Sequence, residues 1–238
     1  MTLLILALAP VLILLVYVYI RDKYEREPIS LLLKGLGLGA LIVIPVIFAE
    51  KFLQSLPPDT NTLFDPAYTA FVVAGFTEEL FKFLALYFLI WKNPNFNEKF
   101  DGIVYAVFIS LGFAAIENIM YVMGNGVQTG YLRAFTAVPA HALFGVAMGY
   151  YFGLAKFQRK KRSIHMYKAF LIPIILHGVY DFIIMSQLSW WLFVFLPYLY
   201  YLWDNGLKKM RELSDHSRFN PDNANGLIIE KTEDFTED

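Results

Sequence analysis

The residues of this sequence that could do chemistry are charged and histidine side chains set inside apolar segments. In the apolar run 67–91, the segment EELFK places Glu78, Glu79 and Lys82 within a single helical turn and a half. At the middle of a bilayer each such charge costs roughly 2.5–3.5 kcal/mol, whereas a Leu or Phe returns only about 0.3–0.6 kcal/mol. A chain that keeps three charges in this position must have a compensating use for them.

Three later apolar segments carry groups of the same kind. These groups are, in chain order, Glu117, His141, His177 and Asp181. Ionisable residues inside membrane-spanning segments are rare and are functional candidates by default. A single buried polar residue can serve only to hold helices together, at about 0.6 kcal/mol per contact. Seven ionisable groups on four helices favour a functional site instead.

Helical spacing sorts most of these side chains into neighbours. Residues three or four apart share one face of a helix. Both Glu78 and Glu79 can therefore reach Lys82. By the same spacing, His177 can reach Asp181.

Depth in the membrane points to one pocket. Counted from the outer ends of the predicted helices at about 1.5 Å per residue, Glu78 lies roughly 16 Å deep and Glu117 and Asp181 roughly 9 Å deep. The two histidines fall roughly 12–15 Å deep. His141 also lies on a stripe of small residues that repeats every four positions through 137–153. Such stripes let helices approach closely, so His141 should face protein rather than lipid.

The balance of charge narrows the chemistry. Four carboxylates face one certain cation, Lys82, so the site would carry about three negative charges if all were ionised. A low-dielectric site requires that some carboxyls be protonated, that a histidine be charged, or that a divalent ion be bound. Carboxyl groups tuned in this way suit general acid–base catalysis. The chain has no Cys and no evident Ser-His-Asp arrangement, which leaves water activated by Glu, and hence hydrolysis, as the natural reaction.

The elements that must position these residues are membrane-spanning helices. The chain has 238 residues, of which 57% are hydrophobic and 17% charged, against roughly 25% charged in soluble domains. We expect an all-α, polytopic helix bundle in the cell membrane, with no basic face for nucleic acid. Segments of about 20 apolar residues predict seven spans. They are 2–20, 31–53, 67–91, 102–123, 133–155, 168–187 and 189–204.

Loop charge predicts the orientation. Lys and Arg concentrate in alternate loops, such as KFQRKKRSIHMYK, and are absent from QSLPPDTNTLFDP, GNGVQTGY and SQLS. The positive-inside rule then puts the N-terminus outside and the C-terminus in the cytoplasm. The first segment lacks a basic start and a cleavage site, which favours a retained helix over a signal peptide. We expect a transmembrane domain over 1–205 and a polar, acidic, disordered cytoplasmic tail over 206–238.

Taken in order, the motifs resemble those of the PrsW family of intramembrane proteases, which is related to the CAAX prenyl proteases and Abi proteins. EELFK has the form EExxK, FAAIE the form FxxxE and HGVYD the form HxxxD, while HALFGVAMG is a His-led segment with a trailing Gly. The resemblance covers about 67–182. It implies a glutamic-type peptidase that cuts a single-span membrane protein near its extracytoplasmic side, as in site-1 cleavage of an anti-sigma factor.

The resemblance also implies roles for the residues. Glu78 would be the base that activates water, with Glu79 as its partner and Lys82 holding the pair. The groups implied to position water and stabilise the oxyanion are His141, His177 and Asp181. No cofactor is needed for this version of the reaction.

Glu117 is the departure from the CAAX relatives, which carry His at the end of FxxxH. A carboxyl group there cannot stabilise an oxyanion unless it is protonated, which leaves its role open. A zinc-dependent version is the nearest alternative, with Glu117, His141 and His177 as ligands and Glu78 as base. The spacing is not that of HExxH, so the sequence does not decide between them.

Two other classes of protein remain as alternatives. Buried Glu and His residues also relay protons in transporters, although the sequence lacks the internal repeat common in that class. A binding or immunity protein could keep such a fold without cleaving anything. The complete set of candidate catalytic groups argues against that interpretation.

Overall fold

The computed structural model describes residues 2–56, 63–186 and 190–224, and the regular structure in these ranges is helical. The predicted all-α membrane class is confirmed. The elements are α1 (Thr2–Arg21), α2 (Ile29–Gln54), α3 (Phe64–Tyr68), η1 (Thr69–Phe76), α4 (Thr77–Ile90), α5 (Lys99–Asn125), α6 (Val127–Phe135), α7 (Ala137–Phe157), η2 (Arg159–Lys161), α8 (Arg162–Met185), α9 (Trp191–Asp215) and α10 (Pro221–Ala224).

Five segments of the described chain are long and apolar enough to cross a bilayer. They correspond to α1, α2, α5, the α6–α7 pair, and α8 with the turn before it. The predicted spans 67–91 and 189–204 fall on α3–η1–α4 and on α9, which do not meet that criterion. The count of seven spans and the outward N-terminus stay predictions.

The last long helix crosses the predicted domain boundary. α9 continues to Asp215, ten residues beyond the expected end of the membrane domain at 205. Residues 225–238, the last part of the predicted acidic tail, lie outside the described residues. The tail therefore stays a prediction as well.

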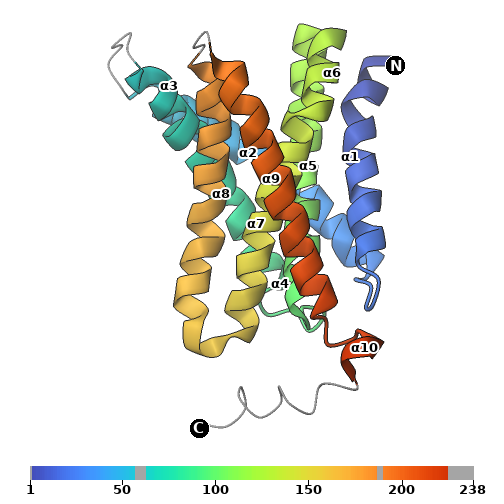
Figure 1. The fold of residues 1–238 in the computed structure, drawn as a ribbon. Coiled ribbons are helices and arrows are strands. Elements are labelled where there is room, and N and C mark those ends of the chain that lie inside the picture. The colour runs from blue at the N-terminus through green and yellow to red at the C-terminus, as the bar shows by residue number, and fades with distance from the viewer. Residues whose placement is uncertain (1, 57–62, 187–189, 225–238) are drawn as a thin grey trace.

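α5 and α7 form the centre of the bundle, with α1 at one edge and α8 at the other (Figure 1). Of the most apolar window across α6 and α7, 94% is buried, against 22% for α1. The two central helices touch at glycines: a Cβ added to Gly149 would lie 2.2 Å from the carbonyl oxygen of Gly102. The stripe of small residues therefore serves close backbone contact, and His141, which is 4% exposed, faces protein as expected.

A second close contact joins α2 to α5. A Cβ on Gly39 would lie 2.0 Å from the carbonyl oxygen of Ile109, and one on Gly112 would lie 2.1 Å from that of Leu36. Gly39 of KGLGLGAL thus serves packing within this chain. This contact places the inner face of α2 beside the site on α5.

The predicted third helix is not a regular α-helix. Its middle, Thr69–Phe76, is a π-helix that ends directly before Glu78 and Glu79. Within it, a Cβ on Gly75 would lie 3.2 Å from backbone atoms of α8. π-Helical turns inside α-helices are frequent at functional sites, because they change the direction of the side chains that follow.

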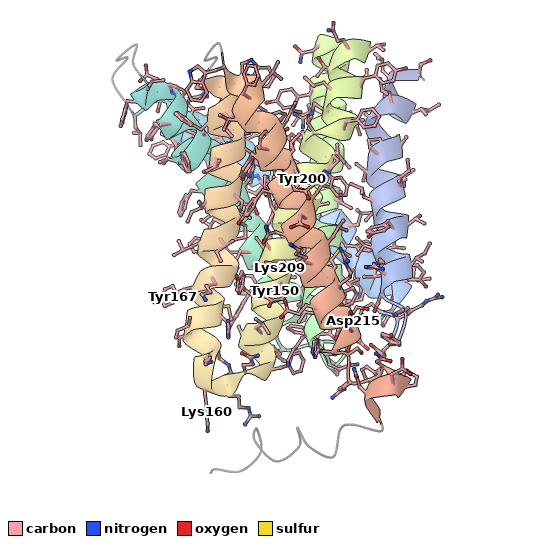
Figure 2. All side chains as sticks on the ribbon, viewed as in Figure 1. Tyr150, Lys160, Tyr167, Tyr200, Lys209 and Asp215 are labelled. Atoms are coloured by element: carbon pink, nitrogen blue, oxygen red, sulfur yellow. The ribbon has the colours of Figure 1, made fainter. Side chains whose placement is uncertain are left out.

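The outer faces of the helices carry apolar and aromatic side chains, whereas charged groups gather at the lower end (Figure 2). Lys160 extends from the turn between α7 and α8, and Asp215 lies at the end of α9. The turn that holds Lys160 belongs to the basic loop predicted to face the cytoplasm. The candidate site lies on the helices away from this end.

Candidate active site

Lys82 lies at the centre of the site, and its ammonium group joins three of the predicted residues. Nζ donates to Oε2 of Glu78 at 2.9 Å and to Oε1 of Glu79 at 2.8 Å. It also lies 3.2 Å from Nδ1 of His141, which belongs to α7. The Lys82 side chain is only 1% exposed. The predicted pairing of both carboxylates with Lys82 is therefore present and shielded from solvent.

His177, on α8, connects the acidic pair to Asp181. Its Nδ1 lies 3.0 Å from Oε1 of Glu79, and its Nε2 lies 3.2 Å from Oδ2 of Asp181. An ionised carboxylate can only accept hydrogen bonds, so both ring nitrogens are placed to donate, as in an imidazolium ion. Phe144 stacks on the ring with centroids 4.9 Å apart, which fixes its orientation.

His141 connects Lys82 to Glu117, on α5. Its Nε2 lies 2.8 Å from Oε2 of Glu117. The ammonium of Lys82 can only donate, so Nδ1 of His141 must accept and Nε2–H must donate to the carboxylate. His141 is therefore neutral in this arrangement, in contrast to His177.

Arg133, on α6, is a residue of the site that the motifs did not indicate. Its Nη2 donates to Oε2 of Glu117 at 2.8 Å, and its Nε donates to Oδ1 of Asn118 at 2.8 Å. Asn118 in turn donates to the carbonyl oxygen of Ala7 on α1 at 2.8 Å. An arginine in the apolar stretch YLRAFTAVPAH, with no acidic residue on its own helix, was the available signal. Such a residue must find a carboxylate on another helix.

A cavity of about 340 Å³ opens onto this network. Glu78 lines it, whereas Glu79 and Lys82 do not; the latter two lie behind it at 0% and 1% exposure. The polar residues of the lining are Glu50, Gln54, Thr69, Glu78, Glu117, Tyr121, Arg133, His141, His177, Tyr180 and Asp181. All seven predicted residues thus belong to one network, in which five face the cavity and two support it from behind.

Glu50 is a second lining residue that the motifs did not indicate. It comes from the last turns of α2, where it precedes Lys51 in the segment FAEKF. Its neighbours on α2, Val43, Val46 and Ile47, give the cavity one apolar wall. The mouth of the site therefore combines a carboxylate with surface that an apolar segment could contact.

A polar cavity with a buried acidic pair, inside a helical membrane bundle, is the kind of site that an intramembrane hydrolase requires. Comparison with known proteins identifies which kind. Residues 27–203 match the model of a family described as PrsW family intramembrane metalloprotease. The chain therefore belongs to the PrsW family, and it is a multi-pass membrane peptidase.

Individual relatives agree with the family match. The chain is 40% identical over 210 residues to Protease PrsW of Geobacillus kaustophilus, covering 88% of this chain and 91% of that protein. It is 37% identical over 206 residues to Protease PrsW of Bacillus subtilis, covering 86% of this chain and 92% of that protein. It is 38% identical over 220 residues to Protease PrsW of Clostridioides difficile, covering 90% of this chain and 92% of that protein. The comparison with solved structures returned no significant match.

The family description includes a metal, so the fit of the site to a metal ion can be examined. Glu78, Glu79, His141 and His177 offer ligand atoms that all lie within 4.8 Å of one another. Lys82 Nζ, however, already lies 2.8–3.2 Å from an atom of each of the first three. A divalent ion among these atoms would stand directly beside an ammonium group, where repulsion is strong. The residues as arranged fit an ammonium-centred site rather than a metal-centred one.

Proposed function

We propose that this chain is an intramembrane endopeptidase of glutamic type, in which Glu78 activates the attacking water. The single observation that carries the proposal is the asymmetry of the acidic pair. Both carboxylates bind Lys82, but Glu78 lines the cavity while Glu79 is completely buried. A base must reach the water and the substrate, and the geometry favours Glu78.

In the proposed reaction, Glu78 accepts a proton from water as the water oxygen attacks the scissile carbonyl. The tetrahedral intermediate carries the negative charge on its oxygen. Glu78 then returns the proton to the departing amine nitrogen as the C–N bond breaks, so that one water is consumed and two chain ends are formed. General base catalysis of this kind contributes about 10²–10⁴-fold to a rate.

Positive charge around the cavity would stabilise the oxyanion. His177, placed as an imidazolium, and Arg133 both line the cavity. Arg133 uses two of its nitrogens for Glu117 and Asn118, and its remaining guanidinium N–H groups, which have no hydrogen-bond partner among the described residues, are available to a substrate oxygen. Glu117 then serves to hold Arg133 and His141 in place. In this role the carboxyl group of Glu117 acts in its ionised form and does not need to bind the oxyanion itself.

The substrate class follows from the cavity and from the family resemblance. A site within the helical bundle, with one apolar wall on α2, suits a single transmembrane segment of another protein. The predicted depth places cleavage near the extracytoplasmic side of that segment. A membrane-anchored anti-sigma factor, cut at its first site, is the substrate that the resemblance implies.

A zinc-dependent reaction at the same residues is the second candidate. It is favoured by the cluster of Glu78, Glu79, His141 and His177 and by the family's description. It requires Lys82 to move away from the cluster. The two candidates differ in what a chelator does to the purified enzyme.

The test is cleavage of a single-span substrate by the purified protein in vesicles. Glu78→Gln should abolish cleavage, because Gln keeps the volume but cannot take a proton. Asp204→Asn is a matched control, since Asp204 pairs with Lys208 at the surface of α9. Activity that survives a zinc chelator supports the glutamic version; loss of activity that added zinc restores would contradict it and favour the second candidate.

A further inference from the structure

A second cluster of carboxylates lies far from the active site, where the loop between α1 and α2 meets the start of α5. The groups in this cluster are Asp22, Glu25, Glu27, Glu98 and Asp101. All except Glu25 are at most 5% exposed. The loop lies at the end of the bundle where α10 is found, opposite the N-terminus (Figure 1).

Part of the cluster is explained by local structure. One oxygen of Asp101 accepts the backbone N–H groups of Asn97 and Glu98, at 2.8 and 2.7 Å, which caps the first turn of α5. One oxygen of Glu27 accepts the hydroxyl of Tyr105. These bonds occupy Oδ2 of Asp101 and Oε2 of Glu27 and leave the other oxygen of each carboxylate to be accounted for.

Within the part of the chain that the structure describes, those other oxygens accept no hydrogen bond from outside the cluster. Oε1 of Glu27, Oδ1 of Asp101 and Oε2 of Glu25 are all buried and unpaired. The three residues offer oxygen atoms that lie within 4.8 Å of one another. Glu27 is 2% exposed and Asp101 0% exposed, so both carboxyl groups are shielded from bulk solvent. Native proteins rarely leave buried acceptors unsatisfied, and three that converge are placed to share one ligand.

No cation of the protein supplies that partner. Within the described ranges 2–56, 63–186 and 190–224, the ion pairs at 4.0 Å or less do not include Glu25, Glu27 or Asp101. The active site differs in this respect, because there Lys82 pairs with the carboxylates of both Glu78 and Glu79. A buried carboxyl group without a compensating cation avoids ionisation, and burial raises the pKa of Glu27 to about 7.

We propose that Glu25, Glu27 and Asp101 bind a hard divalent cation, Mg²⁺ or Ca²⁺. The available ligand atoms are oxygens only, which these ions prefer and which do not favour zinc. Glu25 is half-buried at the rim of the cluster, so an ion can enter there and complete its coordination with water. The ion would join the α1–α2 loop to the first turn of α5, the helix that carries Glu117.

The experiment uses the purified full chain, stripped of cations with EDTA, and measures thermal unfolding and heat of binding as MgCl₂ or CaCl₂ is added. The parent protein should bind one of these ions and unfold at a temperature several degrees higher. The variant Glu27→Gln/Asp101→Asn should lose both effects. Glu78→Gln is the control that separates the two acidic clusters, and it should respond as the parent does.

The order of stabilities provides a sharper criterion. In EDTA the Glu27→Gln/Asp101→Asn variant should be at least as stable as the parent, because the amides keep the volume of the carboxyl groups and are neutral at every pH. With saturating cation the parent should unfold at a higher temperature than the variant. If neither ion raises the unfolding temperature at up to about 10 mM, or if the variant responds as the parent does, the proposal is wrong.

A milder variant covers the case in which the double variant does not fold. Glu25→Gln changes only the half-buried rim residue, which should be tolerated. It should weaken binding of the ion at least tenfold while leaving the unfolding temperature in EDTA close to that of the parent. Unchanged affinity in Glu25→Gln would also overturn the proposal.

Discussion

Replacing Arg133 by methionine tests how the active site holds its charge. Arg133 donates two hydrogen bonds of 2.8 Å, one of them to the carboxylate of Glu117. Removing one partner of a fully buried ion pair costs about 3–5 kcal/mol. The two side chains keep 13% and 16% exposure at the cavity, so we expect a smaller loss of about 2–3 kcal/mol in the free energy of unfolding.

A double-mutant cycle separates the pair from each residue's other contacts. Glu117→Gln alone removes the charge but keeps an acceptor, and should cost about 1–1.5 kcal/mol. The double variant Arg133→Met/Glu117→Gln has no unpaired carboxylate. Its loss in the free energy of unfolding should therefore be about 1–2 kcal/mol smaller than the sum of the two single losses. Detergent-induced unfolding of the parent, the two single variants and the double variant in mixed micelles gives the four values.

Cleavage measured on these four proteins and on Arg133→Lys adds a second criterion. Arg133→Lys keeps the positive charge but cannot reproduce the forked contact with Glu117 and Asn118. It should retain more activity than Arg133→Met if charge in the cavity contributes to the reaction. Additive stabilities, with a coupling below about 0.5 kcal/mol, would refute the pairing of Arg133 with Glu117.

Three further outcomes follow from the packing and hydrogen bonds. Gly149→Ala should destabilise the protein by about 1–3 kcal/mol in thermal or detergent unfolding, because its Cβ meets the Gly102 carbonyl at 2.2 Å. Gly124→Ala, with nothing within 4 Å, is the control and should be neutral or stabilising. Lys82→Met should cost about 3–5 kcal/mol and abolish cleavage, because two buried carboxylates lose their cation. Asn118→Leu should slow cleavage with little change in expression, since it frees Arg133 from its second partner; unchanged kinetics would contradict this.

The sequence was sufficient to predict seven of the residues that form the network. Charged side chains are so costly inside apolar helices that Glu78, Glu79 and Lys82 could be selected without any structure. Their spacing also predicted the two bonds to Lys82 that the structure contains. Periodicity likewise placed His141 against another helix rather than lipid.

What the sequence could not supply depends on contacts between distant helices. Arg133 lies 16 residues from Glu117 and on a separate short helix, so no helical spacing relates them. The count of charges therefore omitted one cation, Arg133, and also one further acidic residue, Glu50 on α2. Whether Glu78 or Glu79 faces the cavity depends likewise on how α4 is rotated in the bundle.

The π-helix before the acidic pair explains part of that difficulty. Thr69–Phe76 has an apolar composition that an α-helix would accommodate equally well. Within it Gly75 approaches the backbone of α8, a contact between helices that the local sequence does not specify. Rotation of the following helix, and with it the direction of Glu78, is therefore a property of the assembled bundle.

The most direct test of the proposed mechanism compares Glu78→Gln with Glu79→Gln in single-turnover cleavage of a single-span substrate. Both variants should fold and bind substrate. We predict that Glu78→Gln lowers the cleavage rate by about 10³-fold or more, and that Glu79→Gln lowers it less, because that residue acts only through Lys82 and His177. A Glu78→Gln protein that cleaves at the parent rate would contradict the assignment of Glu78 as the base.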